Sequence, residues 1–252
     1  MGAGPFTVFA PANAAFAAAL TELGLTKAQL LANKPRLTTV LTHHVLPARV
    51  ASTAIPFGKA ISTVQGSILK IDNVAGAVVI TDGRYRTSKV VTPDVAASNG
   101  VVHIVDKVIL PADKNIVQTA QSLPQFSILV EAVVAANLQG TLCDTGPFTV
   151  FAPTNTAFAN LLTELGITKD AVLANTPLLT KVLTYHVVSG RVLNAEVPLN
   201  TAIRTVQGDK LTVVSNLGIT DQRARTSKIT PTDVLTSNGV IHVIDKVILP
   251  KP

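Results

Sequence analysis

The side chains best suited to acid–base or metal chemistry are five histidines. They are His43, His44, His103, His186 and His242. A catalytic base or a metal site would need carboxylates or thiols that converge on them. Asp106 and Asp245 each follow a histidine by three residues in a strand-like segment, so they point to the opposite face. We therefore expect buried histidines that hydrogen-bond to backbone or Asn groups, with no metal and no cofactor.

Nucleophilic and phosphate-binding motifs are missing from the sequence. It contains no Gly-x-Ser-x-Gly elbow, no Gly-rich phosphate loop and no Cys-x-x-Cys pair, which predicts a protein that is not an enzyme. The single cysteine, Cys143, excludes a disulfide within the chain and leaves an intermolecular one open. We expect it in a loop and chemically inert.

A group of cationic residues recurs in the two halves of the chain. The first group is Arg84, Arg86 and Lys89, and the second is Arg223, Arg225 and Lys228. Arginines two positions apart share one face of a strand. Such an edge suits acidic polysaccharide, phospholipid headgroups or a protein partner, or it serves only to block pairing between sheets. With a net charge of +6, no Trp and two Tyr, the sequence does not predict nucleic-acid binding.

The elements that must position these residues occur twice. Residues 5–11 (Pro-Phe-Thr-Val-Phe-Ala-Pro) recur as residues 147–153, and 29 of the 42 residues from Pro5 match those from Pro147. Such self-similarity requires a shared fold. We predict two domains of one type, residues 1–113 and 114–252.

Three short helices should follow the first strand of each repeat. In repeat one, Asn13 should cap a helix that stops at Gly24. Thr26 and Gln29 have the spacing of a capping box. Pro35 should open a third helix. This helix would carry inward Leu37, Val40 and Leu41.

The later part of each repeat is β-rich. Segments 61–64, 68–71 and 78–81 read as strands between turn residues. Asn99-Gly100 predicts a tight type I′ turn with positive φ at both residues, followed by a long buried strand over 101–110. Helices first and strands later indicate an α+β fold, with a two-sheet β-wedge flanked by short helices in each repeat.

Repeat two has a leading segment, residues 114–145, without a counterpart in repeat one. Its apolar residues have helical spacing and should pack on the domain. They are Phe126, Ile128, Leu129, Val130, Val133, Val134 and Leu138. Repeat one should then expose apolar surface. We expect either that the parent protein continues upstream or that self-association covers this surface.

Three motifs resemble those of fasciclin-like domains. The first is residues 7–16 (Thr-Val-Phe-Ala-Pro-Ala-Asn-Ala-Ala-Phe) and its copy at 149–158. The second is residues 98–106 (Ser-Asn-Gly-Val-Val-His-Ile-Val-Asp) and its copy at 237–245. Between them lies a Tyr-His pair, present as Tyr185-His186 and replaced by His43-His44 in repeat one. The resemblance covers nearly the whole chain, and the absence of an Asn-x-Ser/Thr sequon fits a bacterial product.

The resemblance implies a β-sandwich wedge flanked by helices and a role in adhesion or matrix contact. It implies a secreted, periplasmic or cell-surface location, with an extracellular protein, a polysaccharide or a cell surface as partner. The start of the chain lacks the features of a signal peptide, so export cannot be read from it. In the family the Tyr-His region is implicated in adhesion, so a binding role carries over more safely to Tyr185-His186 than to His43-His44.

The resemblance also implies an alternative function. Fasciclin-like domains hold apolar small molecules, including carotenoids, between helix and sheet. The Ala-rich segment 14–20 and a mean hydropathy of +0.42 would suit a groove for a carotenoid or lipid.

Overall fold

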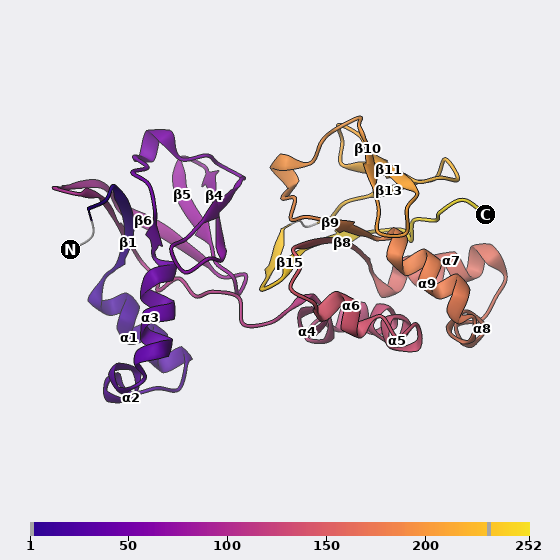
Figure 1. The fold of residues 1–252 in the computed structure, drawn as a ribbon, viewed down its shortest axis with the longest axis horizontal. Helices are drawn as coiled ribbons and strands as arrows, with labels where there is room; N and C mark the ends of the chain where they lie inside the picture. Colours follow the sequence, from indigo (N-terminus) through magenta and orange to yellow (C-terminus); the bar gives the residue numbers. More distant parts are fainter. Residues whose placement is uncertain (1–2, 231–232) are drawn as a thin grey trace. The chain divides into compact units, whose positions relative to one another are not determined.

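The computed structural model describes residues 3–230 and 233–252, which divide into two compact units. Unit 1 is Met1–Asp113 and unit 2 is Lys114–Pro252. Figure 1 shows that each unit combines a group of helices with β-strands. The α+β fold predicted from the sequence is confirmed.

Unit 1 begins with a strand, continues with three helices and ends in a series of strands. Its helical elements are α1 (Asn13–Glu22), α2 (Lys27–Ala32), α3 (Lys34–His43) and the 3₁₀ turn η1 (Ser52–Ala54). Its strands are β1 (Phe6–Pro11), β2 (Val45–Leu46), β3 (Ala60–Ser62), β4 (Ile68–Val74), β5 (Ala77–Thr81), β6 (Thr87–Ala97) and β7 (Gly100–Val105). They pair in the order β2-β1-β7-β6-β5-β4-β3, with β1 parallel to β7.

The long strand β6 joins the two halves of this sheet. It pairs with β5 at one end and with β7 at the other, and its register shifts between Val90 and Thr92 and again between Thr92 and Val95. Such bulges bend a strand and increase its twist. Because of these bends, the single strand β6 can belong to both sheets of the wedge.

Unit 2 repeats this order after a helical leading segment. Its helical elements are α4 (Ile116–Gln121), η2 (Pro124–Phe126), α5 (Ser127–Ala135), α6 (Gln139–Cys143), α7 (Asn155–Leu165), α8 (Lys169–Ala174), α9 (Thr176–Tyr185) and η3 (Asn194–Glu196). Its strands are β8 (Phe148–Pro153), β9 (Val187–Ser189), β10 (Ala202–Arg204), β11 (Lys210–Val213), β12 (Gly218–Thr220), β13 (Thr226–Lys228), β14 (Val234–Thr236) and β15 (Gly239–Ile244). They form two four-stranded sheets, β10-β11-β12-β13 and β14-β15-β8-β9.

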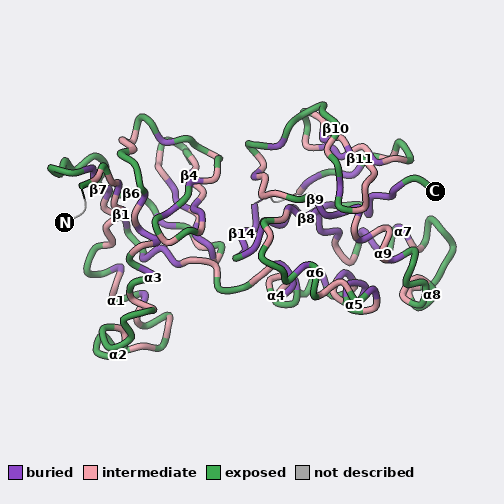
Figure 2. The backbone as a smooth tube through the Cα atoms, viewed as in Figure 1, coloured by how far each residue is buried: buried purple, intermediate pink, exposed green. Residues whose placement is uncertain are grey.

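The leading segment packs into the main core of unit 2, as predicted. Phe126, Leu129 and Val133 are buried there together with residues of β8, α7 and β15, and Figure 2 shows the buried stretches of α4 and α5. Val134 differs from the prediction, because its side chain is 49% exposed. Cys143 is exposed at the end of α6, where a loop was expected.

The helix starts agree with the sequence in part. The capping box of Thr26 and Gln29 is confirmed, and Pro35 lies in the first turn of α3. The prediction that Asn13 caps α1 is wrong: α1 begins at Asn13, and its cap position is Ala12, which has no side-chain oxygen to accept from the first turn. The prediction that Leu41 points inward is wrong: it is 44% exposed, whereas the equivalent Leu183 of unit 2 is buried in the core that contains residues of α4 and α5.

The prediction of a type I′ turn at Asn99-Gly100 is also wrong. Neither residue has a positive φ, and Gly100 is the first residue of β7. A Cβ at Gly100 would overlap the carbonyl oxygen of Phe6 on the parallel strand β1. Glycine is needed here for this close approach of two strands. The strand β7 then ends at Val105, well before residue 110.

Candidate binding surfaces

His44, the residue that follows α3, ties this helix to the buried segment around Ile109. Nδ1 of His44 lies 2.7 Å from the carbonyl oxygen of Val40, and Nε2 accepts the amide N–H of Ile109 at 2.9 Å. His186 makes the same two kinds of bond in unit 2. Burial lowers the pKa of both histidines, and that of His186 falls to about 4. Both are therefore neutral at pH 7, with both ring nitrogens bonded.

The residue before this histidine differs between the repeats. In unit 2 the Tyr185 hydroxyl donates to the carbonyl oxygen of Lys210 at 2.9 Å. In unit 1, Nδ1 of His43 lies 2.8 Å from Oγ of Ser67, while Nε2 is buried and has no hydrogen-bond partner among the described residues. Burial and the neighbouring His44 lower the pKa of His43 to about 4.

The strand histidines His103 and His242 are also bonded to backbone. Nε2 of His103 donates to the carbonyl oxygen of Val50 at 2.9 Å, and Nδ1 accepts the N–H of Asp94 at 3.1 Å. Nε2 of His242 lies 2.9 Å from the carbonyl oxygen of Val192. The predicted role of the histidines, to satisfy backbone groups in an apolar setting, is confirmed for these residues.

The four residues of the Tyr-His region all lie inside their units. Tyr185 and His43 are completely buried, and His44 and His186 are 2% exposed. They do not lie on the surface where direct contact with a partner would take place. They could affect binding only indirectly, by fixing the position of the backbone to which they hydrogen-bond. Their role in binding stays a prediction.

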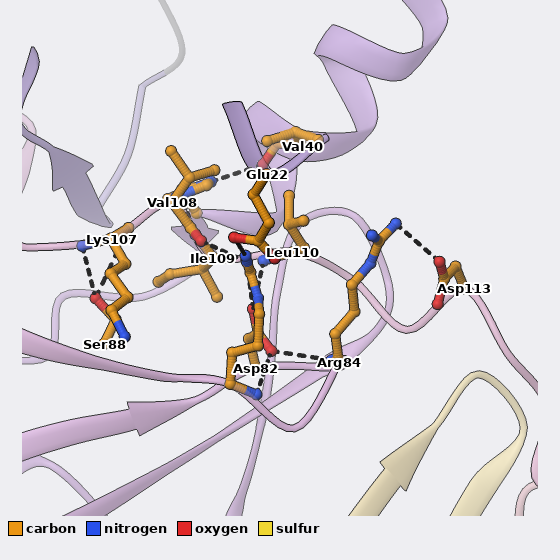
Figure 3. A network of polar contacts seen from close by, with 12 residues as sticks. Glu22, Val40, Asp82, Arg84, Ser88, Lys107, Val108, Ile109, Leu110 and Asp113 are labelled. Atoms are coloured by element: carbon orange, nitrogen blue, oxygen red, sulfur yellow. Dashed lines mark hydrogen bonds and ion pairs between the residues drawn. The ribbon is translucent and has the colours of Figure 1, made fainter. Parts of the chain in front are cut away.

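The predicted placement of the arginines on one strand face is wrong in both units, because Arg223 and Arg225 also lie in a turn, between β12 and β13. Arg84 and Arg86 lie in the turn between β5 and β6, where the buried carboxylate of Asp82 organises the backbone. Asp82 accepts the amide N–H groups of Arg84, Arg86 and Leu110 at 2.9–3.0 Å. Figure 3 shows this carboxylate at the centre of the turn.

The guanidinium of Arg86 is occupied within unit 1. It lies 2.8 Å from Asp82 and 2.6 Å from Glu22 of α1, and it donates to the carbonyl oxygen of Val108 at 2.8 Å. Arg84 pairs with Asp113 at 2.9 Å (Figure 3). Because these contacts join the turn to distant segments, the arginines stabilise the unit.

Unit 2 repeats much of this arrangement. Asp221 is buried and accepts the N–H groups of Arg223, Arg225 and Leu249. Arg225 lies 3.3 Å from Glu164 of α7. The repeated carboxylate was missed in the sequence, although it precedes the arginines by two and four residues in both copies. The sequence did offer a signal for it, because an aspartate stands at the same position before the two arginines in both repeats.

The lysines of the two cationic groups lie at the surface. Lys89 on β6 and Lys228 on β13 are exposed. The backbone N–H of each donates to a carboxylate, Asp106 or Asp245, at 2.7 Å. The same hydrogen bond thus fixes the backbone of an exposed cation in each unit. A binding role for the six cationic residues stays a prediction.

Cavities suitable for an apolar ligand differ between the units. Unit 2 has a cavity of about 280 Å³ between α7, α9 and the C-terminal segment, lined by apolar residues such as Phe158, Leu161 and Leu179. The Ala-rich helix α1 of unit 1 borders a pocket of about 410 Å³ whose lining includes Glu22, Arg86 and Lys107. The apolar groove expected at this helix is therefore partly charged.

The described part of the chain has neither a cluster of metal ligands nor a helix that could cross a membrane. Residues 3–230 and 233–252 contain no group of three or more His, Cys, Asp or Glu side chains that could hold a metal ion. Within the same residues, no helix combines the length and apolar character that crossing a membrane requires.

Each unit thus defines a helix-and-strand domain with the same buried histidine and aspartate contacts. The Fasciclin domain family matches residues 1–111 and 124–250. The chain belongs to this family, which confirms the resemblance found in the sequence.

Known relatives match either both units or about half of the chain. Transforming growth factor-beta-induced protein ig-h3 of Sus scrofa is 30% identical over 254 residues, which cover 99% of this chain and 35% of that protein. The chain therefore spans about a third of this relative. The uncharacterized protein sll1735 of Synechocystis is 44% identical over 135 residues, which cover 54% of this chain and 97% of that protein.

A solved structure has a similar arrangement of elements. It is that of a FAS1 domain pair from the insect cell adhesion molecule fasciclin I, with a TM-score of 0.53 and 17% sequence identity. The similarity covers 97% of this chain and 88% of the solved chain. At this identity it supports the fold of a tandem pair.

Proposed function

We propose that the chain is a secreted or cell-surface adhesion module that binds an extracellular protein, a polysaccharide or a cell surface by non-covalent contact. The observation that carries this proposal is that both units belong to the Fasciclin domain family. The solved domain pair of similar fold comes from a cell adhesion molecule. The histidines are bonded to backbone and side-chain partners in each unit's interior, which favours surface contact over catalysis.

We expect the exposed side chains of Lys89 and Lys228 to contact an acidic target. Full-length chain passed over surfaces coated with heparin, type I collagen or peptidoglycan should bind at least one of them. The double change Lys89→Glu and Lys228→Glu should weaken this binding at least tenfold, with a steep dependence on salt.

A control with the same charge change uses two other exposed lysines, Lys59→Glu and Lys210→Glu. It should leave binding within about twofold of the unmodified chain. Binding to none of the three surfaces, or equal losses in both double variants, would contradict the proposal. The change Arg86→Glu is unsuitable as a test, because it would break the contacts with Asp82 and Glu22.

A second function is favoured by the apolar cavity of unit 2. Its volume of about 280 Å³ and its apolar lining suit part of a lipid or carotenoid chain. Protein purified from its native source would then carry visible absorbance or an extractable lipid. A colourless, lipid-free protein that still binds the coated surfaces would exclude the carrier function.

A further inference from the structure

A pocket beside helix α1 of unit 1 brings an aromatic ring together with charged side chains. Its volume is about 410 Å³. The small side chains of Ala15, Ala18 and Ala19 line it from α1, and Tyr85 lines it from the turn between β5 and β6. A hollow with an apolar wall and a few polar groups is the usual form of a site for a small molecule.

The ring of Tyr85 is presented by a turn that is already fixed. Tyr85 is 53% exposed, and its backbone N–H donates to the carbonyl oxygen of Asp82 at 3.1 Å. The carboxylate of Asp82 accepts the N–H groups of the residues on either side, Arg84 and Arg86 (Figure 3). A ligand that stacks on the ring therefore does not have to order the turn first.

The backbone of Tyr85 has a conformation that is unfavourable for a bulky residue. Its φ is 60°, in the left-handed region. Ala224, the equivalent residue of unit 2, has a φ of 56°. The turn thus takes this conformation in both units, and alanine is sufficient for it. Since the fold of the turn does not require the aromatic ring, the ring points to a function.

Three charged side chains also line the pocket, and they are Glu22, Arg86 and Lys107. Arg86 lies 2.6 Å from Glu22 and fixes it, while the side chain of Glu22 stays 51% exposed. A carboxylate held in this way can accept further hydrogen bonds from hydroxyl groups. Lys107 is exposed and gives the pocket a net positive charge.

A sugar ring that carries a carboxylate has the chemistry that these groups select. Its C–H face is apolar and can stack on an aromatic side chain. Its hydroxyl groups can donate to Glu22, and its carboxylate is attracted to Lys107. An acidic peptide would meet the same cations, but it would place carboxylates against Glu22 without hydroxyl donors.

We propose that this pocket of unit 1 binds one uronic acid unit of an acidic polysaccharide. The sugar ring lies on Tyr85, its hydroxyl groups donate to Glu22 and its carboxylate lies beside Lys107. The inference rests on the proposed function, of which it specifies the polysaccharide partner.

Unit 2 lacks two parts of this site. It has the equivalent charged residues, Glu164, Arg225 and Lys246, but Ala224 replaces the tyrosine. Leu161 stands at the position of Ala19, so the wall on the helix is bulkier. The site is therefore expected in unit 1 only, and unit 2 supplies the controls.

The test is the titration of the ¹⁵N-labelled full-length chain with trigalacturonic acid, followed by NMR. We expect saturable shifts of the backbone amides of Tyr85, Arg86 and Lys107, without matching shifts in the equivalent turn of unit 2. The methyl ester of the same trisaccharide keeps the rings and loses the charge. It should bind at least about fivefold more weakly, because the charge-assisted contact with Lys107 is lost.

The contribution of the ring is tested with Tyr85→Ala, which introduces the residue of unit 2. This variant should weaken the binding of trigalacturonic acid about tenfold, because the stacking surface is lost. Tyr85→Phe keeps the ring and should stay within about threefold of the unmodified chain. Both variants should fold, since Ala224 takes the same backbone conformation, and circular dichroism checks this.

The contribution of the charge is tested with Lys107→Gln, which should weaken binding about fivefold. Its matched control is Lys246→Gln, the same change at the equivalent lysine of unit 2. The control should leave the affinity within about twofold of the unmodified chain, because Lys246 belongs to the unit that lacks the ring.

Several results would overturn the proposal. They are the absence of saturable shifts in unit 1, an affinity that Tyr85→Ala leaves unchanged, and equal binding of the methyl ester. A hexaglutamate peptide that binds as tightly as the trisaccharide would show that the pocket recognises charge alone, which would overturn it as well.

These outcomes are separate from a failure of the adhesion function. A chain that binds the coated surfaces through Lys89 and Lys228 but does not bind trigalacturonic acid at Tyr85 would contradict this inference alone. A chain that binds the trisaccharide at Tyr85 but none of the coated surfaces would contradict the adhesion function and leave the sugar site in place.

Discussion

At the scale of single residues, the two units differ in how many imidazoles they bury beside the end of the third helix. Unit 2 has a tyrosine at the first position, and its hydroxyl finds a carbonyl partner. Unit 1 has His43, whose Nε2 finds no hydrogen-bond partner within residues 3–230 and 233–252. A buried neutral imidazole resists protonation, because the charged form loses its hydration.

This difference predicts that acid destabilises unit 1 through His43. The pKa of His43 is lowered from 6.5 to about 4 by burial, so the unfolded chain takes up the proton first as the pH falls. The stability of the neutral state is complete above pH 6.5 and is lost between pH 6.5 and 4, on the order of 3 kcal/mol. Urea unfolding over this pH range, read by hydrogen exchange in unit 1, measures the loss.

The control for this prediction is taken from the second repeat. His43→Tyr introduces the residue that unit 2 has at the equivalent position, and it should reduce the pH dependence of unit 1 between pH 4 and 6.5, with the contribution of His44 remaining. Unit 2 keeps His186 and should be unchanged. The same slope in the variant as in the unmodified chain would show that His43 is not the group that titrates.

The sequence predicted the histidines better than the arginines. A histidine flanked by apolar residues in a strand or at a helix end has few partners other than backbone, so its role follows from local pattern. The partner of Arg86, Glu22, lies 64 residues away in the chain. This contact depends on how α1 packs beside the turn, which local spacing does not encode.

At the scale of elements, the two repeats start the same helix with different caps. Thr154 accepts the N–H of Ala157 at the start of α7, whereas Ala12 leaves the equivalent N–H of α1 without a side-chain cap. We predict that Ala12→Thr stabilises unit 1 by about 1 kcal/mol. Urea unfolding of the variant measures this gain.

The control is Ala14→Thr, which makes the same chemical change inside the helix. Thr156 is the equivalent residue in unit 2, so the position accepts threonine. There the β-branched side chain should cost a few tenths of a kcal/mol. Equal effects of the two changes would contradict the capping explanation.

The parallel contact of β1 and β7 predicts a strong effect of a single methyl group. Gly100→Ala places a Cβ onto the carbonyl oxygen of Phe6, so the strands must move apart. We expect a loss of at least about 2 kcal/mol in unit 1. Thermal unfolding followed by hydrogen exchange measures it.

Gly140→Ala is the matched change in helix α6, where the added Cβ has nothing within 4 Å. It should be neutral or slightly stabilising, because alanine favours helix. A mild effect of Gly100→Ala, comparable with that of Gly140→Ala, would mean that the strands do not require this glycine.

The elements themselves could be predicted in large part. Capping boxes and apolar spacing are local properties of the sequence. They predicted the bounds of the helices and of most strands to within a few residues. The Asn-Gly pair does not form the expected turn, because the requirement at Gly100 comes from Phe6 on a strand near the start of the chain. Sequence alone does not reveal that this strand runs parallel and close.

At the scale of the whole molecule, the repeat was visible because identity between two halves is a property of the sequence. It predicted one fold used twice and the apolar face of unit 1. The groove at that face could be located only with the sheet order of unit 1, because its apolar lining comes from β1, β2 and β7.

The measurement that tests the account most directly is the dissociation of the full-length chain from heparin-coated surfaces of low and high density. If both units are binding modules of one kind, dissociation should slow at least tenfold at high density, because two contacts must release together. The single variants Lys89→Glu and Lys228→Glu should each lose this dependence on density. A chain that dissociates at one rate on both surfaces, or that binds none of heparin, type I collagen and peptidoglycan, would contradict the account.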